Sequence, residues 1–179
     1  YEMSQAFFDD LEIPKPDYFL EAGSGSHAEQ TAKIMINFEK VCEEQHPNLV
    51  VVVGDVNSTL ACSVVAKKMM FEVAHVEAGL RSFDLSMPEE INRMVTDAIS
   101  DYFFVTEKSG VANLKNKGKL DKNIFFVGHV MIDNLLYQLD KVNRSNFSFK
   151  HSKLKEKLGK YIFMTLHRPA NVDARSTLE

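Results

Sequence analysis

Short apolar runs alternate along this chain with longer segments in which apolar residues recur every three or four positions. The clearest run is LVVVV at residues 49–53, and four more occupy residues 73–76, 102–105, 124–127 and 161–165. Runs of this length are typical of buried strands, and the segments between them are typical of helices. The pattern therefore predicts an α/β fold built on a doubly wound parallel sheet, whose strands are buried on both faces.

Apolar stripes at helical spacing fill the segments between or after these runs, and each stripe predicts a helix that packs on the sheet. The stripes consist of Ile34, Phe38, Val41 and Cys42; of Ala61, Val64 and Val65; of Ile91, Met94, Val95 and Ala98; of Val111 and Leu114; and of Ile132, Leu135, Leu136 and Leu139. Two helix starts are also marked, because Ser26 with Glu29 and Ser86 with Glu89 have the spacing of a capping box.

A polar stretch of mixed charge over residues 140–160 interrupts the alternation. We interpret it as an interdomain connection, which predicts a first domain over residues 1–139 and the start of a second over residues 161–179. The chain begins at Tyr1 inside helix-like sequence and ends at Glu179, where a further helical segment starts. We therefore expect it to be a fragment of a longer protein.

The net charge, the cysteines and the length of the apolar runs indicate which partners and which cellular compartment the protein has. The net charge is -4 and the chain has no dense block of Lys and Arg, which argues against nucleic-acid binding. Cys42 and Cys62 both lie in helical patterns, where a free cysteine behaves as a small buried hydrophobe. The longest apolar run, residues 49–53, is far shorter than the roughly twenty residues that span a bilayer. We expect a cytoplasmic protein without nucleic-acid or membrane partners.

Polar side chains follow every predicted strand at its carboxyl end. They include Asp55, Asn57, Ser58 and Thr59 after the first strand, Glu77 and Arg81 after the second, Thr106 and Glu107 after the third, His129 after the fourth, and His167 and Arg168 after the fifth. Because parallel strands end at one edge of the sheet, these residues are expected to line a polar pocket there. Their positions alone do not name a reaction.

Several common cofactor fingerprints are missing from the sequence. Residues 23–26, Gly-Ser-Gly-Ser, lack the third glycine of a dinucleotide loop, and no Gly-Lys-Ser or Gly-Lys-Thr is present. No Cys/His group has zinc spacing, and no G-x-S-x-G elbow exists. We therefore expect neither a nucleotide cofactor such as NAD nor a metal ion.

Five motifs carry a resemblance to a known family, and their order and spacing both match it. They are GDVNST at residues 54–59, HVEAGLRSFD at 75–84, MPEEINR at 87–93, VGHVMID at 127–133 and TLHRP at 165–169. Together they closely resemble the non-hydrolysing UDP-N-acetylglucosamine (UDP-GlcNAc) 2-epimerases over nearly the whole chain. The resemblance implies an isomerase with two Rossmann-like domains in the glycosyltransferase-B arrangement and an active site in the cleft between them. Little activity is expected of residues 1–179 alone, because half the cleft would be missing.

By this resemblance, the reaction inverts carbon 2 of UDP-GlcNAc to give UDP-N-acetylmannosamine through elimination and re-addition of UDP, with 2-acetamidoglucal as the intermediate. The resemblance also implies catalytic roles for Asp55, Glu77 and Glu89, and substrate-binding roles for His167, Arg93, Arg81 and Arg168. Crowded carboxylates repel one another, so one can hold a proton while another acts as a base. A UDP-sugar substrate, a homodimer and a place in polysaccharide biosynthesis complete the expectation.

Local structural roles remain open for several of these residues. Asp55 could cap the helix that follows it, Glu89 could complete the capping box with Ser86, and His75 reads as a structural neighbour of the site. Glu77 has no such alternative, so it is the firmest assignment.

The motifs also depart from the family in two places. Ala170 replaces a common Glu, and His129 stands where Asn is commoner. These departures leave open a regulatory module that binds nucleotide sugars without turnover. Two enzyme alternatives are a hydrolysing epimerase and an epimerase of a diacetamido uronic acid nucleotide, and the motif at residues 75–81 looks unlike either.

Overall fold

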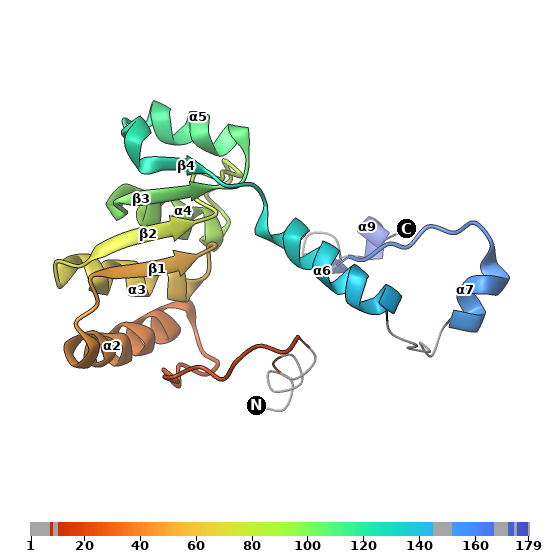
Figure 1. Cartoon of the computed structure of the whole chain (residues 1–179), viewed down its shortest axis with the longest axis horizontal. Helices are drawn as coiled ribbons and strands as arrows, with labels where there is room; N and C mark the ends of the chain where they lie inside the picture. Colours follow the sequence, from red (N-terminus) through yellow and green to blue (C-terminus); the bar gives the residue numbers. More distant parts are fainter. Residues whose placement is uncertain (1–7, 9–10, 145–151, 167–171, 174, 179) are drawn as a thin grey trace. The chain divides into compact units, whose positions relative to one another are not determined.

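The computed structural model describes residues 8, 11–144, 152–166, 172–173 and 175–178 (Figure 1). The chain divides into two compact units, Tyr1–Asp133 and Asn134–Glu179. The domain boundaries expected at residues 139 and 161 stay a prediction.

The first unit contains a four-stranded parallel sheet with the strand order β1-β2-β3-β4 (Figure 1). The strands are β1 (Leu49–Val53), β2 (Glu72–Val76), β3 (Tyr102–Val105) and β4 (Ile124–Phe126). These bounds confirm the first four predicted strands to within one residue at either end. Neighbouring strands are in register, so their carboxyl ends meet at a common edge of the sheet.

Helices of the first unit cover one face of this sheet. They are α2 (His27–Gln45), α3 (Asn57–Lys68), α4 (Pro88–Ile99) and α5 (Lys108–Asn116), with a short 3-10 helix η1 (Asp121–Asn123) before β4. Val52 packs with Ala66 of α3, and Phe103 packs with Leu114 of α5. Val52 and Phe103 both flank His75 in the register, so the two strand residues lie on the same face. Right-handed crossovers that advance in one direction place successive helices on one side of a sheet in this way.

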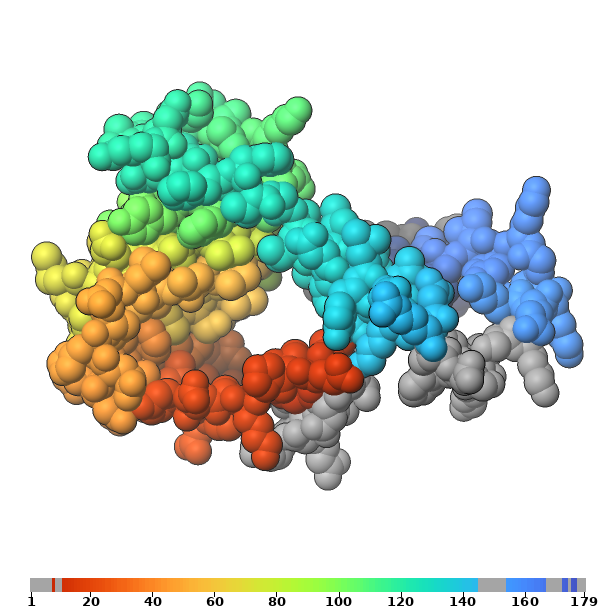
Figure 2. Space-filling view, viewed as in Figure 1, coloured from red at the N-terminus to blue at the C-terminus, as the bar shows by residue number. Residues whose placement is uncertain are grey.

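The opposite face of β1 differs from the expectation that the strands are buried on both faces. Val51 and Val53 are 58% and 54% exposed, whereas Val50 and Val52 are buried. The strand therefore alternates although its sequence is uniformly apolar, because all four helices lie on the other face. In the space-filling view the orange segment that includes β1 forms part of the surface turned toward the viewer (Figure 2).

One of the two predicted capping boxes is confirmed. The Glu29 amide donates to Ser26 Oγ at 3.2 Å, and the Ser26 amide donates to the Glu29 carboxylate at 2.9 Å, at the start of α2. Hydrogen bonding from Ser26 to the Glu29 carboxylate, above all from the Ser26 amide, holds the pKa of Glu29 below its usual value.

The capping box predicted for Ser86 and Glu89 is wrong. Helix α4 begins at Pro88 after Met87, and the Ser86 hydroxyl instead donates to Asp84 at 2.6 Å. Proline is preorganised for the first position of a helix, so it shifts the start by one residue. Glu89 therefore occupies the second helical position and takes no part in a capping box with Ser86.

Helix α6 (Val130–Arg144) spans the boundary between the units, and the second unit contains α7 (Ser152–Leu158) and α9 (Arg175–Leu178). The fifth predicted strand is wrong within the described residues, because 161–166 adopt no regular structure and Ile162 is 95% exposed. A strand is defined by hydrogen bonds to a neighbour, and no described segment pairs with this one. In the described part of the chain, no helix has the length and apolarity needed to cross a membrane.

The two cysteines lie in helices, as the apolar pattern predicts. Both are free; Cys42 is buried in α2, and Cys62 lies in α3. Burial raises the pKa of the Cys62 thiol to about 11. The thiol therefore stays protonated near neutral pH and packs as a small apolar group.

Gly79, in the turn after β2, has a left-handed backbone with φ of +79°, and a Cβ there would lie 2.4 Å from the Gly110 carbonyl oxygen. We expect Gly79→Ala to lower the free energy of unfolding by about 3 kcal/mol, from overpacking and backbone strain together. Gly118 is a matched control, since it has the same φ and no atom within 4 Å of its Cβ position. Gly118→Ala should cost only about 1 kcal/mol for the backbone. If urea denaturation gave the same loss of unfolding free energy for both variants, the close approach to Gly110 would not contribute to the cost of Gly79→Ala.

Candidate active site

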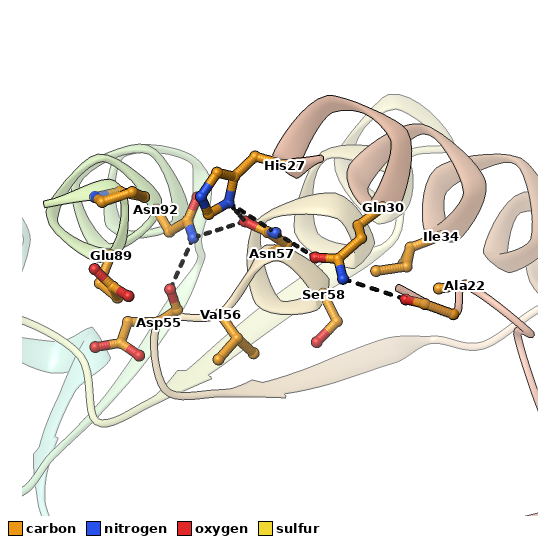
Figure 3. A pocket seen from close by; sticks show the side chains of 12 residues that line it. Ala22, His27, Gln30, Ile34, Asp55, Val56, Asn57, Ser58, Glu89 and Asn92 are labelled. Carbon is orange, nitrogen blue, oxygen red and sulfur yellow. Dashed lines mark hydrogen bonds between the residues drawn. The ribbon is translucent and has the colours of Figure 1, made fainter. Parts of the chain in front are cut away.

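A cavity of about 290 Å³ lies at the carboxyl end of β1, between the amino-terminal ends of α2 and α4 (Figure 3). It is lined by Ala22, Gly23, His27, Gln30, Ile34, Asp55, Val56, Asn57, Ser58, Pro88, Glu89 and Asn92. Asp55 comes from the turn after β1 and Glu89 from the first turn of α4, and Figure 3 shows both carboxylates on the same side of the cavity. The pocket expected at this edge of the sheet is therefore present, and two of the three predicted acids line it.

Amide side chains form the rest of the polar wall. Asn57 Nδ2 donates to Gln30 Oε1 at 2.9 Å, and the Asn57 side chain also lies within hydrogen-bonding distance of His27 Nδ1 (Figure 3). Asn92 Nδ2 donates to the backbone oxygen of Asp55 at 2.8 Å. The sequence analysis did not assign His27, Gln30 or Asn92 to the site, although Asn92 lies within the MPEEINR motif. The network joins α2, α3 and α4 around the turn that carries Asp55.

Asp55 is held by an arginine and does not cap a helix. The N-cap of α3 is Val56, without a side-chain cap, and the Asp55 carboxylate forms an ion pair with Arg93 Nη2. Arg93 Nη1 donates to Glu90 Oε2 at 3.2 Å, so the guanidinium bridges two carboxylates. The capping role left open for Asp55 is therefore wrong, and two separately predicted site residues, Asp55 and Arg93, are in direct contact.

Glu90 is 1% exposed and anchors the loop between β2 and α4. Its carboxylate accepts hydrogen bonds from the Ser82 amide at 2.9 Å, from Ser82 Oγ at 3.0 Å and from the Phe83 amide at 3.3 Å. Burial raises the pKa of Glu90, but these bonds and the one from Arg93 outweigh it and leave the pKa below its usual value. The sequence analysis did not single out Glu90.

Glu77 stands at the carboxyl end of β2 with a left-handed backbone, φ of 70°. A residue with a side chain pays about 1–2 kcal/mol for this conformation, and such strain is concentrated at functional sites. Glu77 Oε2 lies 3.7 Å from the position that a Cβ on Gly54 would take, immediately before Asp55. The Glu77 carboxylate therefore lies beside the turn that leads into Asp55.

The other predicted substrate-binding residues are not gathered at this cavity. Arg81 Nη2 forms an ion pair with Asp97 at 2.7 Å, and Arg81 Nη1 donates to the Leu80 backbone oxygen. The Arg81 side chain is 7% exposed in this arrangement. His167 and Arg168 lie outside the described residues, so their roles remain predictions.

Helix α4 turns a polar face toward the sheet, which is the reverse of the predicted packing. Glu90, Asn92, Thr96 and Asp97 are buried, whereas Ile91, Met94 and Val95 are 43%, 39% and 37% exposed. Buried polar groups need partners, and the segments after β1 and β2 supply them for Glu90, Asn92 and Asp97. The spacing of Glu90, Arg93 and Asp97, three and then four residues apart, could have revealed this face because their charges recur at the helical period.

His129, one of the departures from the family pattern, has a structural role here. Its Nδ1 accepts a hydrogen bond from the Met131 amide at 3.2 Å, at the start of α6. An asparagine can cap a helix start in the same way, so the substitution preserves the capping function. Over the part of the chain that the structure describes, no three His, Cys, Asp or Glu side chains are grouped so as to hold a metal ion.

Because its folded pKa is lowered, Glu90 stabilises the fold above the pKa of about 4.5 of an unperturbed glutamate, and this stability is lost as the pH falls through the folded value. We expect Glu90→Gln to be less stable than the wild type at neutral pH. Its stability should also fall less steeply with acidification between about pH 5 and pH 3. Urea midpoints measured across this range check the prediction, and parallel curves for the two proteins would contradict it.

Comparison with known proteins places the chain in a family. The family model described as UDP-N-acetylglucosamine 2-epimerase matches residues 1–179. The UDP-N-acetylglucosamine 2-epimerase of Methanocaldococcus jannaschii is 44% identical over 99% of this chain and 48% of its own length. The UDP-2,3-diacetamido-2,3-dideoxy-D-glucuronate 2-epimerase of Pseudomonas aeruginosa is 42% identical over 96% of this chain and 47% of its own length. The chain thus spans about half the length of the relatives it matches.

Solved structures agree with the family match. The crystal structure of the M. jannaschii UDP-GlcNAc 2-epimerase in complex with UDP-GlcNAc and UDP superposes with a TM-score of 0.84 at 43% identity, over 97% of this chain and 48% of that one. The Neisseria meningitidis enzyme bound to UDP-GlcNAc superposes with a TM-score of 0.76 at 29% identity, over 88% and 41% of the two chains. These likenesses confirm the predicted Rossmann-like α/β fold of the glycosyltransferase-B type. The chain belongs to the UDP-N-acetylglucosamine 2-epimerase family.

Proposed function

We propose that the intact protein interconverts UDP-GlcNAc and UDP-N-acetylmannosamine by inverting carbon 2 of the sugar. The observation that supports the proposal is the position of acidic side chains at the carboxyl ends of the neighbouring strands β1 and β2, in a member of an epimerase family. Asp55 and Glu89 line one cavity, and Glu77 lies beside the turn that leads into Asp55.

The chemistry requires acid and base groups on both sides of the ring. The hydrogen on carbon 2 has no adjacent carbonyl to acidify it, so its removal is coupled to the departure of UDP from carbon 1. A carboxylate takes this hydrogen as a proton, the C–H electron pair forms the double bond of 2-acetamidoglucal, and UDP leaves with the electrons of the C1–O bond. UDP then adds back while a second group delivers a proton to the opposite face of carbon 2. We assign these proton transfers to Asp55, Glu77 and Glu89.

Cationic groups have a separate task in this proposal. The leaving diphosphate gains negative charge, which positively charged donors stabilise. Arg93 reaches the Asp55 side of the cavity, and it neutralises part of the charge of the clustered acids. We propose that His167 and Arg168 contact the substrate as well.

Turnover of UDP-GlcNAc by the intact protein in deuterium oxide tests the proposal. We expect UDP-N-acetylmannosamine to form, with deuterium at carbon 2 of both nucleotide sugars by NMR. Free N-acetylmannosamine plus UDP, without UDP-N-acetylmannosamine, would instead identify a hydrolysing epimerase. Binding without any exchange at carbon 2 would identify a regulatory module.

A second candidate substrate is UDP-2,3-diacetamido-2,3-dideoxy-D-glucuronate, because the P. aeruginosa enzyme named for it is 42% identical to this chain. The two substrates differ at carbons 3 and 6 and share the reacting carbon 2. Parallel assays with both nucleotides distinguish them by the ratio of kcat/KM values. A higher kcat/KM for the uronate would make it the assigned substrate, and the proposed elimination chemistry would stay the same.

We further propose that the protein works in the cytoplasm as a homodimer and supplies a sugar nucleotide for polysaccharide biosynthesis. The exposed stripe of Ile91, Met94 and Val95 on α4 supports self-association, because apolar surface of this kind is favoured at interfaces. Met94→Glu should shift the protein to a monomer in light-scattering chromatography. If the molar mass of this variant equalled that of the wild-type dimer, α4 would not be part of the dimer interface.

A further inference from the structure

Asp97 of α4 contacts three residues in or directly after β2. Its Oδ1 lies 2.7 Å from His75 Nδ1, and its Oδ2 accepts the Gly79 amide at 3.1 Å and pairs with Arg81 Nη2 at 2.7 Å. Asp97 is 3% exposed and His75 is fully buried. We call this group, His75 with Asp97 and Arg81, the Asp97 clamp.

Both ring nitrogens of His75 face hydrogen-bond acceptors. Nδ1 faces the Asp97 carboxylate, and Nε2 lies 2.8 Å from the backbone oxygen of Gly54. A neutral imidazole carries one N–H, and its other nitrogen presents a lone pair. A lone pair directed at the Gly54 carbonyl oxygen would be repulsive at this distance, whereas an N–H makes a good hydrogen bond. A proton on each nitrogen, as in the imidazolium form, makes both contacts hydrogen bonds.

The clamp touches the chain on both sides of Glu77 and directly before Asp55. His75 comes two residues before Glu77, and Gly79 comes two residues after it. Gly54, which receives the Nε2 hydrogen bond, directly precedes Asp55. One carboxylate on α4 thus fixes the turn after β2 directly and the turn after β1 through His75.

We propose that His75 is held as a buried cation and that Asp97 and His75 are positioning residues, which set the relative placement of Asp55 and Glu77. The effect on turnover rests on the epimerase function proposed above. The charge state of His75 does not, because it follows from the hydrogen bonds alone.

The charge of the clamp suits its surroundings. A buried cation is costly unless an ionised partner is in contact, and Asp97 supplies that partner. Arg81 and Lys119 line a cavity beside Asp97, so positive charge surrounds its carboxylate and favours the ionised form. One negative and two positive charges leave the clamp with a net positive charge behind Asp55 and Glu77, which reduces the repulsion between these acids.

Nitrogen-15 NMR of the histidine-labelled protein near neutral pH tests the charge state. We expect both ring nitrogens of His75 to show the shifts and one-bond proton couplings of N–H groups, with the signals assigned by their loss in His75→Gln. A signal from an unprotonated ring nitrogen of His75 would overturn the proposal. Failure of the wild type to epimerise any substrate would leave this result intact and would count only against the proposed function.

Kinetics of Asp97→Asn in the intact protein test the positioning role. We expect kcat to fall about 100-fold, because small displacements of catalytic groups cost this much, while KM changes less than about threefold. Asp101→Asn is the control, since Asp101 ties Lys67 of α3 and the Val73 amide at the opposite end of β2. Its kcat should equal that of the wild type.

Equal kcat values for the Asp97→Asn and Asp101→Asn variants would overturn the positioning role. If Asp97→Asn does not fold, the His75→Gln variant tests the same role. His75→Gln keeps Asp97 with Arg81 and Gly79, but both N–H groups of a glutamine amide are on one nitrogen, so they do not reproduce the two separate ring donors that face Asp97 and the Gly54 oxygen. This variant should lose kcat with little change in KM, and a wild-type kcat would again contradict the proposal.

Discussion

Replacing Glu77 by Gln in the intact protein is expected to lower kcat about 10³-fold while the protein remains folded. Glutamine keeps the size of the side chain beside Gly54, but it can neither accept nor deliver the proton of carbon 2. The strained backbone at this position, φ of 70°, is also retained, so the loss reflects chemistry. Turnover measured with UDP-GlcNAc, with circular dichroism as a check on folding, gives the answer.

Glu72→Gln is the matched control for this prediction. Glu72 lies at the start of the same strand and accepts a hydrogen bond from the Tyr102 hydroxyl at 3.0 Å, at the edge of the sheet opposite to the acids. Its removal should leave kcat unchanged. A Glu77→Gln variant that retains more than about a tenth of wild-type kcat would exclude Glu77 from proton transfer.

Exchanging the adjacent residues Glu89 and Glu90 one at a time for Ala is expected to have opposite consequences. Glu90→Ala should lower the free energy of unfolding by about 4 kcal/mol, because Arg93 and the amides of Ser82 and Phe83 lose a buried partner. Glu89→Ala should change stability by less than about 0.5 kcal/mol, since its side chain lines the open cavity. The same Glu89 variant should lower kcat about 100-fold or more.

Urea denaturation and turnover, measured on both variants, separate these effects. The account assigns Glu90 to the architecture of the loop before α4 and Glu89 to the chemistry. If Glu89→Ala were the less stable variant, or if it turned over like the wild type, that assignment would be reversed.

Local patterns were enough to predict the first four strands and the start of α2. LVVVV at β1 and the pair Ser26 and Glu29 each act within a few residues, and both predictions are confirmed. The position of Glu77 beside the turn that leads into Asp55 followed from topology, because the carboxyl ends of parallel strands share an edge. The general position of the candidate site could therefore be predicted without coordinates.

Interactions between distant segments explain what the sequence analysis missed. Asp97 is 22 residues from His75, and Arg93 is 38 residues from Asp55, so no local period reveals either pair. The apolar stripe of α4 was assigned to the core because apolar faces usually pack inward. Here the strand-end turns offer polar partners, and they reverse the orientation of the helix.

Two other errors have simple physical causes. Pro88 starts α4 one residue later than the capping-box spacing implies, so Ser86 bonds to Asp84 instead. The apolar run at residues 161–166 has the composition of a strand but no hydrogen-bonded neighbour among the described residues. Composition alone cannot supply a pairing partner.

The central claim is that Asp55, Glu77 and Glu89 act on one pyranose ring at the edge of the sheet. A crystal structure of the intact protein with UDP-GlcNAc bound in the cavity beside Asp55 tests it most directly. The account predicts carboxylates on both faces of the ring, each within about 3 Å of the reacting groups or one water away. A sugar ring bound with Glu77 and Asp55 directed at different regions would contradict it.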